Sequence, residues 1–106
     1  MAARKLGLML STPPSHPSVE TVVQLAQAAL RRGVEVYLYL IDEGVKTAVD
    51  QRYVDLIDAG VKMSVCAYGC QQHGVLTTTV DSRAALSGLV VLSGIIDSCD
   101  RFLAFT

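Results

Sequence analysis

Three residues with chemically reactive side chains lie close together in one short segment of the chain: Cys66, Cys70 and His73. Cys66 directly follows an apolar run at residues 61–65, which predicts a buried strand, and a helix is expected to begin just behind it. Backbone N–H groups at the start of a helix favour negative charge, so a thiol placed there is stabilised as a thiolate. The position of Cys66 therefore predicts a reactive cysteine, against the alternative of a small buried apolar residue.

Cys70 and His73 extend this candidate site if the segment is helical. Cys70 would then share a helix face with Cys66, and two thiols so placed can exchange a persulfide, shield it or resolve it as a disulfide. His73 can pair with a thiolate or transfer a proton. The alternatives are a packing cysteine and an exposed histidine at a helix end, and both interpretations stay open for each residue.

The same three side chains are also candidate metal ligands, with His16 as a candidate fourth. The spacing Cys66-x3-Cys70-x2-His73 matches no common zinc signature, and a structural zinc site needs four ligands, so we expect no metal. Residues 11–14 follow a predicted strand but are not glycine-rich and lack the lysine of a phosphate-binding loop. We therefore expect no cofactor.

Strand and helix patterns alternate along the whole chain. Apolar runs predict strands at residues 5–10, 34–41, 61–65, 76–80 and 101–105, of which the fourth is short and weak. Helical spacing predicts helices at 17–33, 49–59 and 81–98, capped by Ser15 or Ser18 at the first and by Asp81 at the last, with a turn at 42–45. This alternation predicts one α/β domain over residues 1–106, built on a parallel sheet with helices on both faces.

The predicted topology also places the reactive residues. Ligands bind outside the carboxyl ends of the strands in such sheets. His16, Cys66, Cys70 and His73 are all expected at that edge. Cys99 precedes the last strand, so we expect it at the opposite edge, as a structural residue.

Composition excludes several classes of protein. The net charge is −1 and no basic stretch exceeds two residues, so we expect no direct binding of nucleic acid. No apolar run approaches the length of a membrane span, the N-terminus does not read as a signal peptide, and three cysteines do not make a disulfide framework. We therefore expect a cytoplasmic protein. A chain of 106 residues that is 51% hydrophobic leaves apolar surface outside its own core, which predicts an oligomer.

Several stretches together resemble the DsrE/DsrF-like family, and within it the TusD/DsrE branch of sulfur-relay proteins. One is Val65-Cys66 followed by Gly74-Val75, similar to the family's strand-end cysteine, short helix and Gly-Val. Further stretches are Leu86-Ser87-Gly88-Leu89 with Leu92, and Cys99-Asp100-Arg101 with Phe105. Residues 42–45 and 24–33 also fit, so the resemblance spans nearly the whole chain.

The resemblance implies a three-layer α/β/α domain with a five-stranded, mostly parallel sheet, assembled into trimers or hexamers. It also implies a sulfurtransferase in which Cys66 accepts a sulfane sulfur as a persulfide and passes it to a cysteine of a partner protein. The expected partners are sulfur donor and acceptor proteins, together with further copies of the chain or paralogous subunits. The alternative is a non-catalytic oligomeric subunit, or a binding module that responds to oxidation or to a metal.

The chain departs from the TusD pattern in two respects. The link between Val75 and the last helix is shorter here. Cys70 and His73 stand where small or basic residues are usual, so a two-cysteine variant of the chemistry is an open hypothesis.

Overall fold

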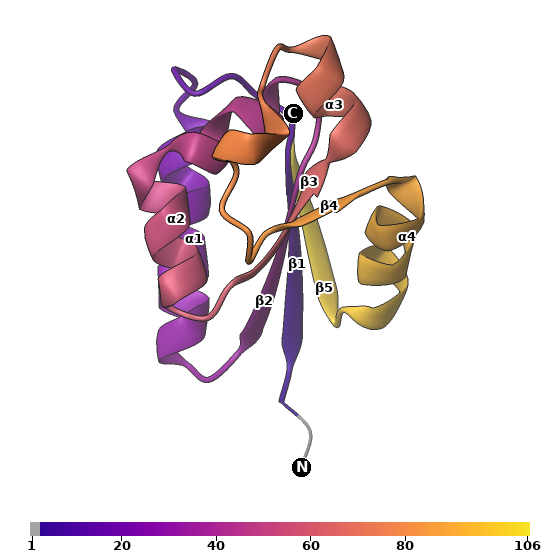
Figure 1. Cartoon of the computed structure of the whole chain (residues 1–106). Helices are drawn as coiled ribbons and strands as arrows, with labels where there is room; N and C mark the ends of the chain where they lie inside the picture. The colour runs from indigo at the N-terminus through magenta and orange to yellow at the C-terminus, as the bar shows by residue number, and fades with distance from the viewer. Residues whose placement is uncertain (1–2) are drawn as a thin grey trace.

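Five parallel strands form a sheet in the order β4-β3-β2-β1-β5 in the computed structural model, which describes residues 3–106 (Figure 1). Every neighbouring pair is parallel, which confirms the predicted sheet. The strands are β1 (Lys5–Leu10), β2 (Glu35–Leu40), β3 (Lys62–Cys66), β4 (Ala85–Ser87) and β5 (Arg101–Phe105).

Helices cover both faces of the sheet, which confirms the predicted three-layer arrangement. The helices α1 (Ser18–Arg31) and α2 (Gln51–Asp58) pack on one face, and α4 (Leu89–Ser98) lies on the other (Figure 1). A short helix, α3 (Ala67–Gln72), stands at the carboxyl end of β3. Two 3₁₀ segments, η1 (Asp42–Val49) and η2 (Thr77–Thr79), complete the described chain. No helix within residues 3–106 combines the length and the apolar character that crossing a membrane requires.

The alternation of side chains along the strands decides which residues face α4. A Cβ added at Gly7 would lie 2.9 Å from Cγ2 of Ile95, so Gly7 faces α4 and lets the helix approach the sheet closely. The alternate residues Leu8 and Leu10 are fully buried on the opposite face. Because neighbouring strands are in register, residues on the Gly7 face of β1 lie beside residues on the same face of the next strand.

Following this register across the sheet places Cys66 on the α4 face. Met9 pairs with Tyr39, Tyr39 pairs with Ser64, and Ser64 is two residues before Cys66. Cys66 in turn pairs with Ser87, the last residue of β4. Tyr39, Cys66 and Ser87 therefore project from the same face of the sheet, near its carboxyl edge.

The prediction of a fourth strand at residues 76–80 is wrong. Thr77–Thr79 form the 3₁₀ turn η2 and none of them is buried, Leu76 is 69% exposed, and only Val80 at the end of the segment reaches the core. The fourth strand is Ala85–Ser87, which pairs with residues 64–66 of β3. The three threonines suggested a strand through their β-branched side chains, but tertiary pairing decides strand formation.

The predicted start of the last helix is also wrong. Asp81 accepts a hydrogen bond from the backbone N–H of Arg83 at 2.9 Å and so forms a turn, and α4 begins only at Leu89. Gly88, expected inside the helix, is its N-cap residue, whereas Gly94 does lie within it.

Two local expectations near the first strands need smaller corrections. Neither Ser15 nor Ser18 caps α1; instead Nδ1 of His16 accepts a hydrogen bond from the backbone N–H of Ser18 at 3.1 Å. The expected turn at 42–45 is the first part of η1, which continues to Val49 before α2 begins.

Candidate functional site

Cys66 occupies the junction that the sequence predicted. It is the last residue of β3 and the N-cap of α3, and its Sγ accepts a hydrogen bond from the backbone N–H of Gly69 at 3.3 Å. The residue is only 5% exposed. The first turn of α3 thus directs a backbone N–H at the sulfur.

Gly69 permits this contact because it has no side chain. A Cβ added there would lie 2.8 Å from Cγ1 of Val45, a fully buried residue of η1, and 3.3 Å from the backbone nitrogen of Asp42. α3 therefore packs against η1 at a distance that only glycine allows. The same close packing holds the first turn of α3 above the Cys66 sulfur.

A cavity of about 370 Å³ opens beside Cys66. It lies between α3, the end of β2 and the first residues of α4. Its lining residues are Ile41, Asp42, Cys66, Tyr68, Gly69, Gln72, His73, Gly88 and Leu89. The buried thiol thus borders a cavity large enough for further atoms on its sulfur.

His73 and Asp42 form a hydrogen-bonded pair in the lining of this cavity. Nε2 of His73 lies 2.7 Å from Oδ1 of Asp42. A carboxylate only accepts, so the Nε2 nitrogen carries a proton, and Nδ1 is the basic nitrogen of the neutral ring. Asp42 itself has a φ of +52°, a left-handed conformation that aspartate tolerates better than most residues. His73 is thus held in place by the first residue of η1.

Cys70 is close to Cys66 in the chain but is closed off from solvent. It is fully buried in the core, and burial, followed by the charge of Cys66, raises the pKa of the Cys70 thiol. All three cysteines of the chain are free thiols. Cys70 therefore has the surroundings of a packing residue, and a resolving role for it stays a prediction.

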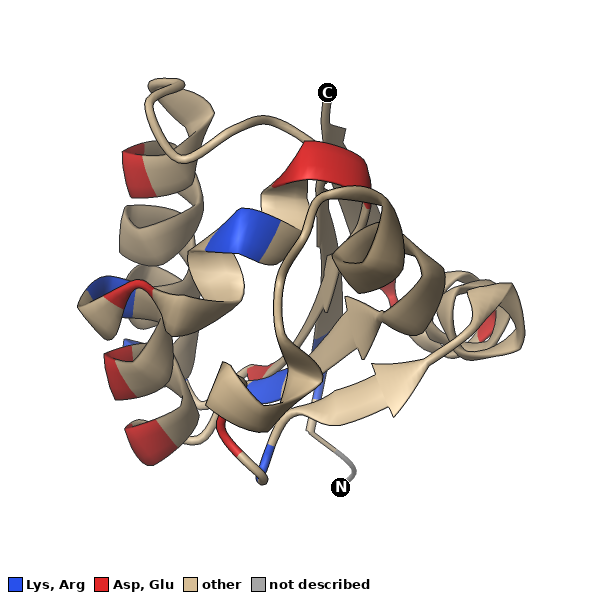
Figure 2. Cartoon of the chain, turned by 45° about the horizontal axis from the view of Figure 1, so that its top comes forward, with Lys and Arg blue, Asp and Glu red and all other residues tan. Residues whose placement is uncertain are grey.

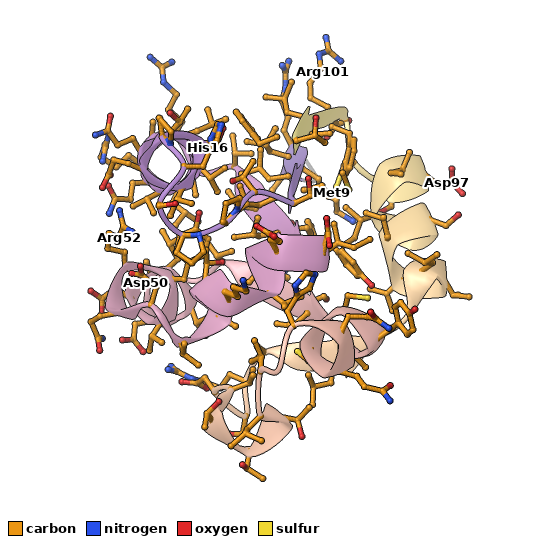
Figure 3. The ribbon with its side chains drawn as sticks, turned by 90° about the horizontal axis from the view of Figure 1, so that it is seen from above. Met9, His16, Asp50, Arg52, Asp97 and Arg101 are labelled. Carbon is orange, nitrogen blue, oxygen red and sulfur yellow. The ribbon has the colours of Figure 1, made fainter. Side chains whose placement is uncertain are left out.

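The remaining predicted residues lie outside the cavity. Figure 3 looks down on the carboxyl edge of the sheet and shows His16 beside the start of α1. Cys99 lies at the opposite edge, ahead of β5, and its Sγ would be 3.2 Å from a Cβ added at Gly7. Within residues 3–106, no group of three or more histidine, cysteine, aspartate or glutamate side chains is arranged to hold a metal ion. Cys66, Cys70 and His73, the candidate ligands, do not form such a group.

Tyr39 and Ser87 belong to the surroundings of Cys66 but were not identified from the sequence. The Tyr39 hydroxyl donates a hydrogen bond to the Gly88 carbonyl at 3.0 Å. Burial, followed by the charge of Cys66, raises the pKa of Tyr39 to about 12. A tyrosine within an apolar strand gives no sign of this role, because only the strand pairing brings it beside the cysteine.

Comparison with known proteins identifies the family. The model of the DsrE/DsrF-like family matches residues 4–105, nearly the entire chain. No curated protein sequence matches this chain.

Three solved structures share the fold at low sequence identity. The ychN protein from E. coli is 17% identical, with a TM-score of 0.83 over 98% of this chain and 100% of its own. BT1422 from Bacteroides thetaiotaomicron, a conserved protein of unknown function, is 14% identical, with a TM-score of 0.79 over 95% of this chain and 94% of its own. MTH1491 from Methanobacterium thermoautotrophicum, also of unknown function, is 12% identical, with a TM-score of 0.75 over 97% and 99%. At these identities the likeness establishes the fold alone.

Proposed function

Because the chain belongs to the DsrE/DsrF-like family, we propose that it is a sulfur carrier in which Cys66 holds a sulfane sulfur as a persulfide. The observation that carries this proposal is the junction at Cys66. Its sulfur accepts the Gly69 N–H and borders a cavity of about 370 Å³. A buried packing cysteine would need neither a hydrogen bond to its sulfur nor open space beside it.

The proposed reaction has two thiol-exchange steps. The Cys66 thiolate attacks the outer sulfur of a donor persulfide, the donor's S–S bond breaks, and the electron pair leaves with the donor thiolate. The product is Cys66–S–SH or its anion. A thiolate of the acceptor protein then attacks the outer sulfur, and Cys66 leaves as a thiolate. One sulfur atom is transferred in each step, and no external oxidant or reductant is consumed.

His73 is the proposed proton acceptor for the Cys66 thiol before the attack. It lines the same cavity, and its bond to Asp42 leaves Nδ1 as the basic nitrogen. Cys70 is the proposed shielding or resolving thiol. Its side chain is fully buried, so α3 must move before Cys70 can reach a persulfide on Cys66. The donor and acceptor proteins are identified here only by the cysteine persulfide and the cysteine thiolate that they must present.

Mass spectrometry after exposure to a cysteine persulfide tests the proposal. We expect the mass of one added sulfur atom on the peptide that contains Cys66. Trypsin cleaves after Lys62 and next after Arg83, so Cys66 and Cys70 fall in the same peptide. Fragment ions of that peptide must therefore show which of the two cysteines carries the added sulfur. Cys66→Ser should abolish loading and Cys99→Ser should not. Equal loading of the Cys66→Ser variant would exclude the proposal and favour a non-catalytic subunit.

We also propose that the chain assembles with copies of itself through α4. Several apolar side chains of this helix stay exposed in the single chain: Leu89, Val90, Val91 and Ile96. Figure 2 shows several charged positions along α1 and α2, whereas the ten residues of α4 include one charged residue, Asp97. An open cavity of about 560 Å³ also lies beneath α4 on this face. A self-complementary assembly would cover this apolar surface.

The free thiols suit a reducing compartment, so we propose a cytoplasmic location.

A further inference from the structure

The hydroxyl of Ser87 is buried next to the reactive cysteine and lacks a partner. Its Oγ is buried and makes no hydrogen bond of good geometry within residues 3–106, although the side chain lies close enough to the Tyr39 hydroxyl to offset part of the rise in the pKa of that tyrosine. Most buried hydroxyl groups in proteins are hydrogen-bonded, so an unpaired one calls for an explanation. A hydroxyl carries one proton to donate, and that proton is available here.

Strand pairing places this hydroxyl beside the Cys66 sulfur. Ser87 and Cys66 are register partners on the parallel strands β4 and β3, and each is the last residue of its strand. Side chains of such partners project from the same face of the sheet, and neighbouring strands are about 5 Å apart. Tyr39 holds the backbone at this point. Its hydroxyl lies 3.5 Å from the carbonyl oxygen of Ser87 and 3.0 Å from the carbonyl oxygen of Gly88. The end of β4 is therefore fixed in position against β3.

We propose that the Ser87 hydroxyl donates a hydrogen bond to the sulfur of Cys66 when that sulfur is anionic. The Ser87 hydroxyl makes no hydrogen bond to the sulfur in the resting structure, and the thiol form of Cys66 is a weak acceptor that would not draw the hydroxyl toward it. The thiolate is a strong acceptor and would receive the Ser87 hydroxyl from β4 in addition to the Gly69 N–H from α3, with the Tyr39 hydroxyl also close to the sulfur. Ser87 thereby increases the fraction of Cys66 that is ready to react.

The same bond has a consequence that rests on the proposed sulfur-carrier function. A persulfide anion on Cys66 keeps its inner sulfur at the position where the thiolate sulfur was. The charge of that anion lies on the outer sulfur, which extends into the cavity, so the inner sulfur accepts only weakly. As the acceptor thiolate attacks and the S–S bond breaks, charge returns to the inner sulfur, where the Ser87 hydroxyl supports departure of Cys66 as a thiolate.

The pH dependence of Cys66 alkylation by iodoacetamide tests the hydrogen bond independently of sulfur transfer. Loss of a hydrogen bond to a charged group should raise the midpoint in Ser87→Ala by about one pH unit. Ser87→Thr keeps the hydroxyl and should stay near the wild-type midpoint. Ser64→Ala is the matched control, because Ser64 is a buried serine on the same face, two residues before Cys66. Circular dichroism checks folding, and Ser87→Gly replaces the alanine variant if that one unfolds.

An unchanged midpoint in Ser87→Ala would overturn the proposal, and so would an equal shift in Ser64→Ala. A merely structural role for Ser87 would not separate the threonine variant from the alanine variant. Sulfur loading of the same preparations from a cysteine persulfide is measured in parallel. Failure of the wild-type protein to load contradicts the sulfur-carrier function, whereas the alkylation midpoints still decide the role of Ser87.

Discussion

The backbone N–H of Gly69 donates a hydrogen bond to Sγ of Cys66 across 3.3 Å. Gly69 is also the residue at which α3 meets η1, because an added Cβ would lie 2.8 Å from Cγ1 of Val45. One residue therefore determines both the packing of the short helix and the polar contact to the thiol. Any side chain at this position must move α3 away from η1, and the N–H group moves with it.

We expect Gly69→Ala to destabilise the protein and to make Cys66 less reactive. Overpacking a buried position costs about 1–3 kcal/mol, and Val45 is fully buried, so it cannot easily move aside. Denaturant unfolding measures the free energy of unfolding, and iodoacetamide measures the alkylation rate of Cys66 at neutral pH.

Gly94→Ala is the matched control for this substitution. Gly94 lies inside α4, and a Cβ added there would meet no atom within 4 Å. Alanine should stabilise the helix by about 0.5–1 kcal/mol and leave the reactivity of Cys66 unchanged. A Gly69→Ala variant as stable and reactive as wild type would contradict the packing argument.

Asp42 offers a way to separate backbone strain from the orientation of His73. Its left-handed φ of +52° is unfavourable for alanine by about 1–2 kcal/mol but costs glycine almost nothing. Asp42→Ala should therefore lower the free energy of unfolding, whereas Asp42→Gly should keep or raise it. Both variants lose the 2.7 Å bond to His73, so both should load sulfur more slowly if His73 accepts the thiol proton.

Sulfur loading and thermal melting of the two Asp42 variants provide the measurement. His73→Gln serves as the reference for complete loss of the imidazole. The alternative is that only the less stable alanine variant loads slowly and the glycine variant loads at the wild-type rate. That result would exclude a role for the Asp42–His73 pair in the reaction.

The sheet, its parallel pairing and the position of Cys66 at the end of β3 followed from the sequence. Those elements carry strong local patterns, such as the apolar run that becomes β2 and the helical spacing of α1. The location of β4 did not follow, since Ala85–Ser87 has only three residues and is defined by its pairing with β3. Three consecutive threonines gave a stronger local β pattern nearby, although their segment is exposed and pairs with nothing in the described chain.

The candidate site was predictable only in part, for the same reason. Cys66 is recognisable because its position depends on two adjacent elements of the chain. The bond between His73 and Asp42 joins residues 31 positions apart, and the closeness of Ser87 to Cys66 depends on the register of β4. Neither relationship leaves a local pattern. With the fourth strand predicted at 76–80, Ser87 fell within the predicted helix at 81–98. The closeness of Ser87 to Cys66 was therefore not predictable.

Tyr39 should make the protein sensitive to alkaline pH. Burial, followed by the charge of Cys66, raises its pKa to about 12, compared with an ordinary value of about 10. A raised pKa means that the fold favours the neutral hydroxyl. This contribution is complete below about pH 10 and is lost as the pH rises toward about 12.

Tyr39→Phe should therefore destabilise the protein more at neutral pH than at alkaline pH. At neutral pH it loses the hydrogen bond to the Gly88 carbonyl, at a cost of about 1 kcal/mol. At about pH 11 the difference from wild type should narrow, because phenylalanine does not titrate. Urea unfolding at the two pH values measures this, with exposed Tyr68→Phe as the control. Tyr53 keeps its own alkaline sensitivity in both proteins, since burial raises its pKa as well. A constant difference between wild type and Tyr39→Phe would refute the assignment.

Val90 is the position at which to test self-assembly through α4. It is 87% exposed in the single chain and belongs to the first turn of α4, beside exposed Leu89. A charge placed within a buried apolar contact between copies would be left unpaired, so we expect Val90→Glu to dissociate the assembly while the chain stays folded. Val49→Glu introduces the same charge at a residue of η1 that is 51% exposed and away from α4, and it should leave the assembly intact. Sedimentation velocity of the three proteins measures their mass in solution. A wild-type protein that sediments as a monomer, or a Val90→Glu variant with the wild-type mass, would rule out α4 as the contact between copies.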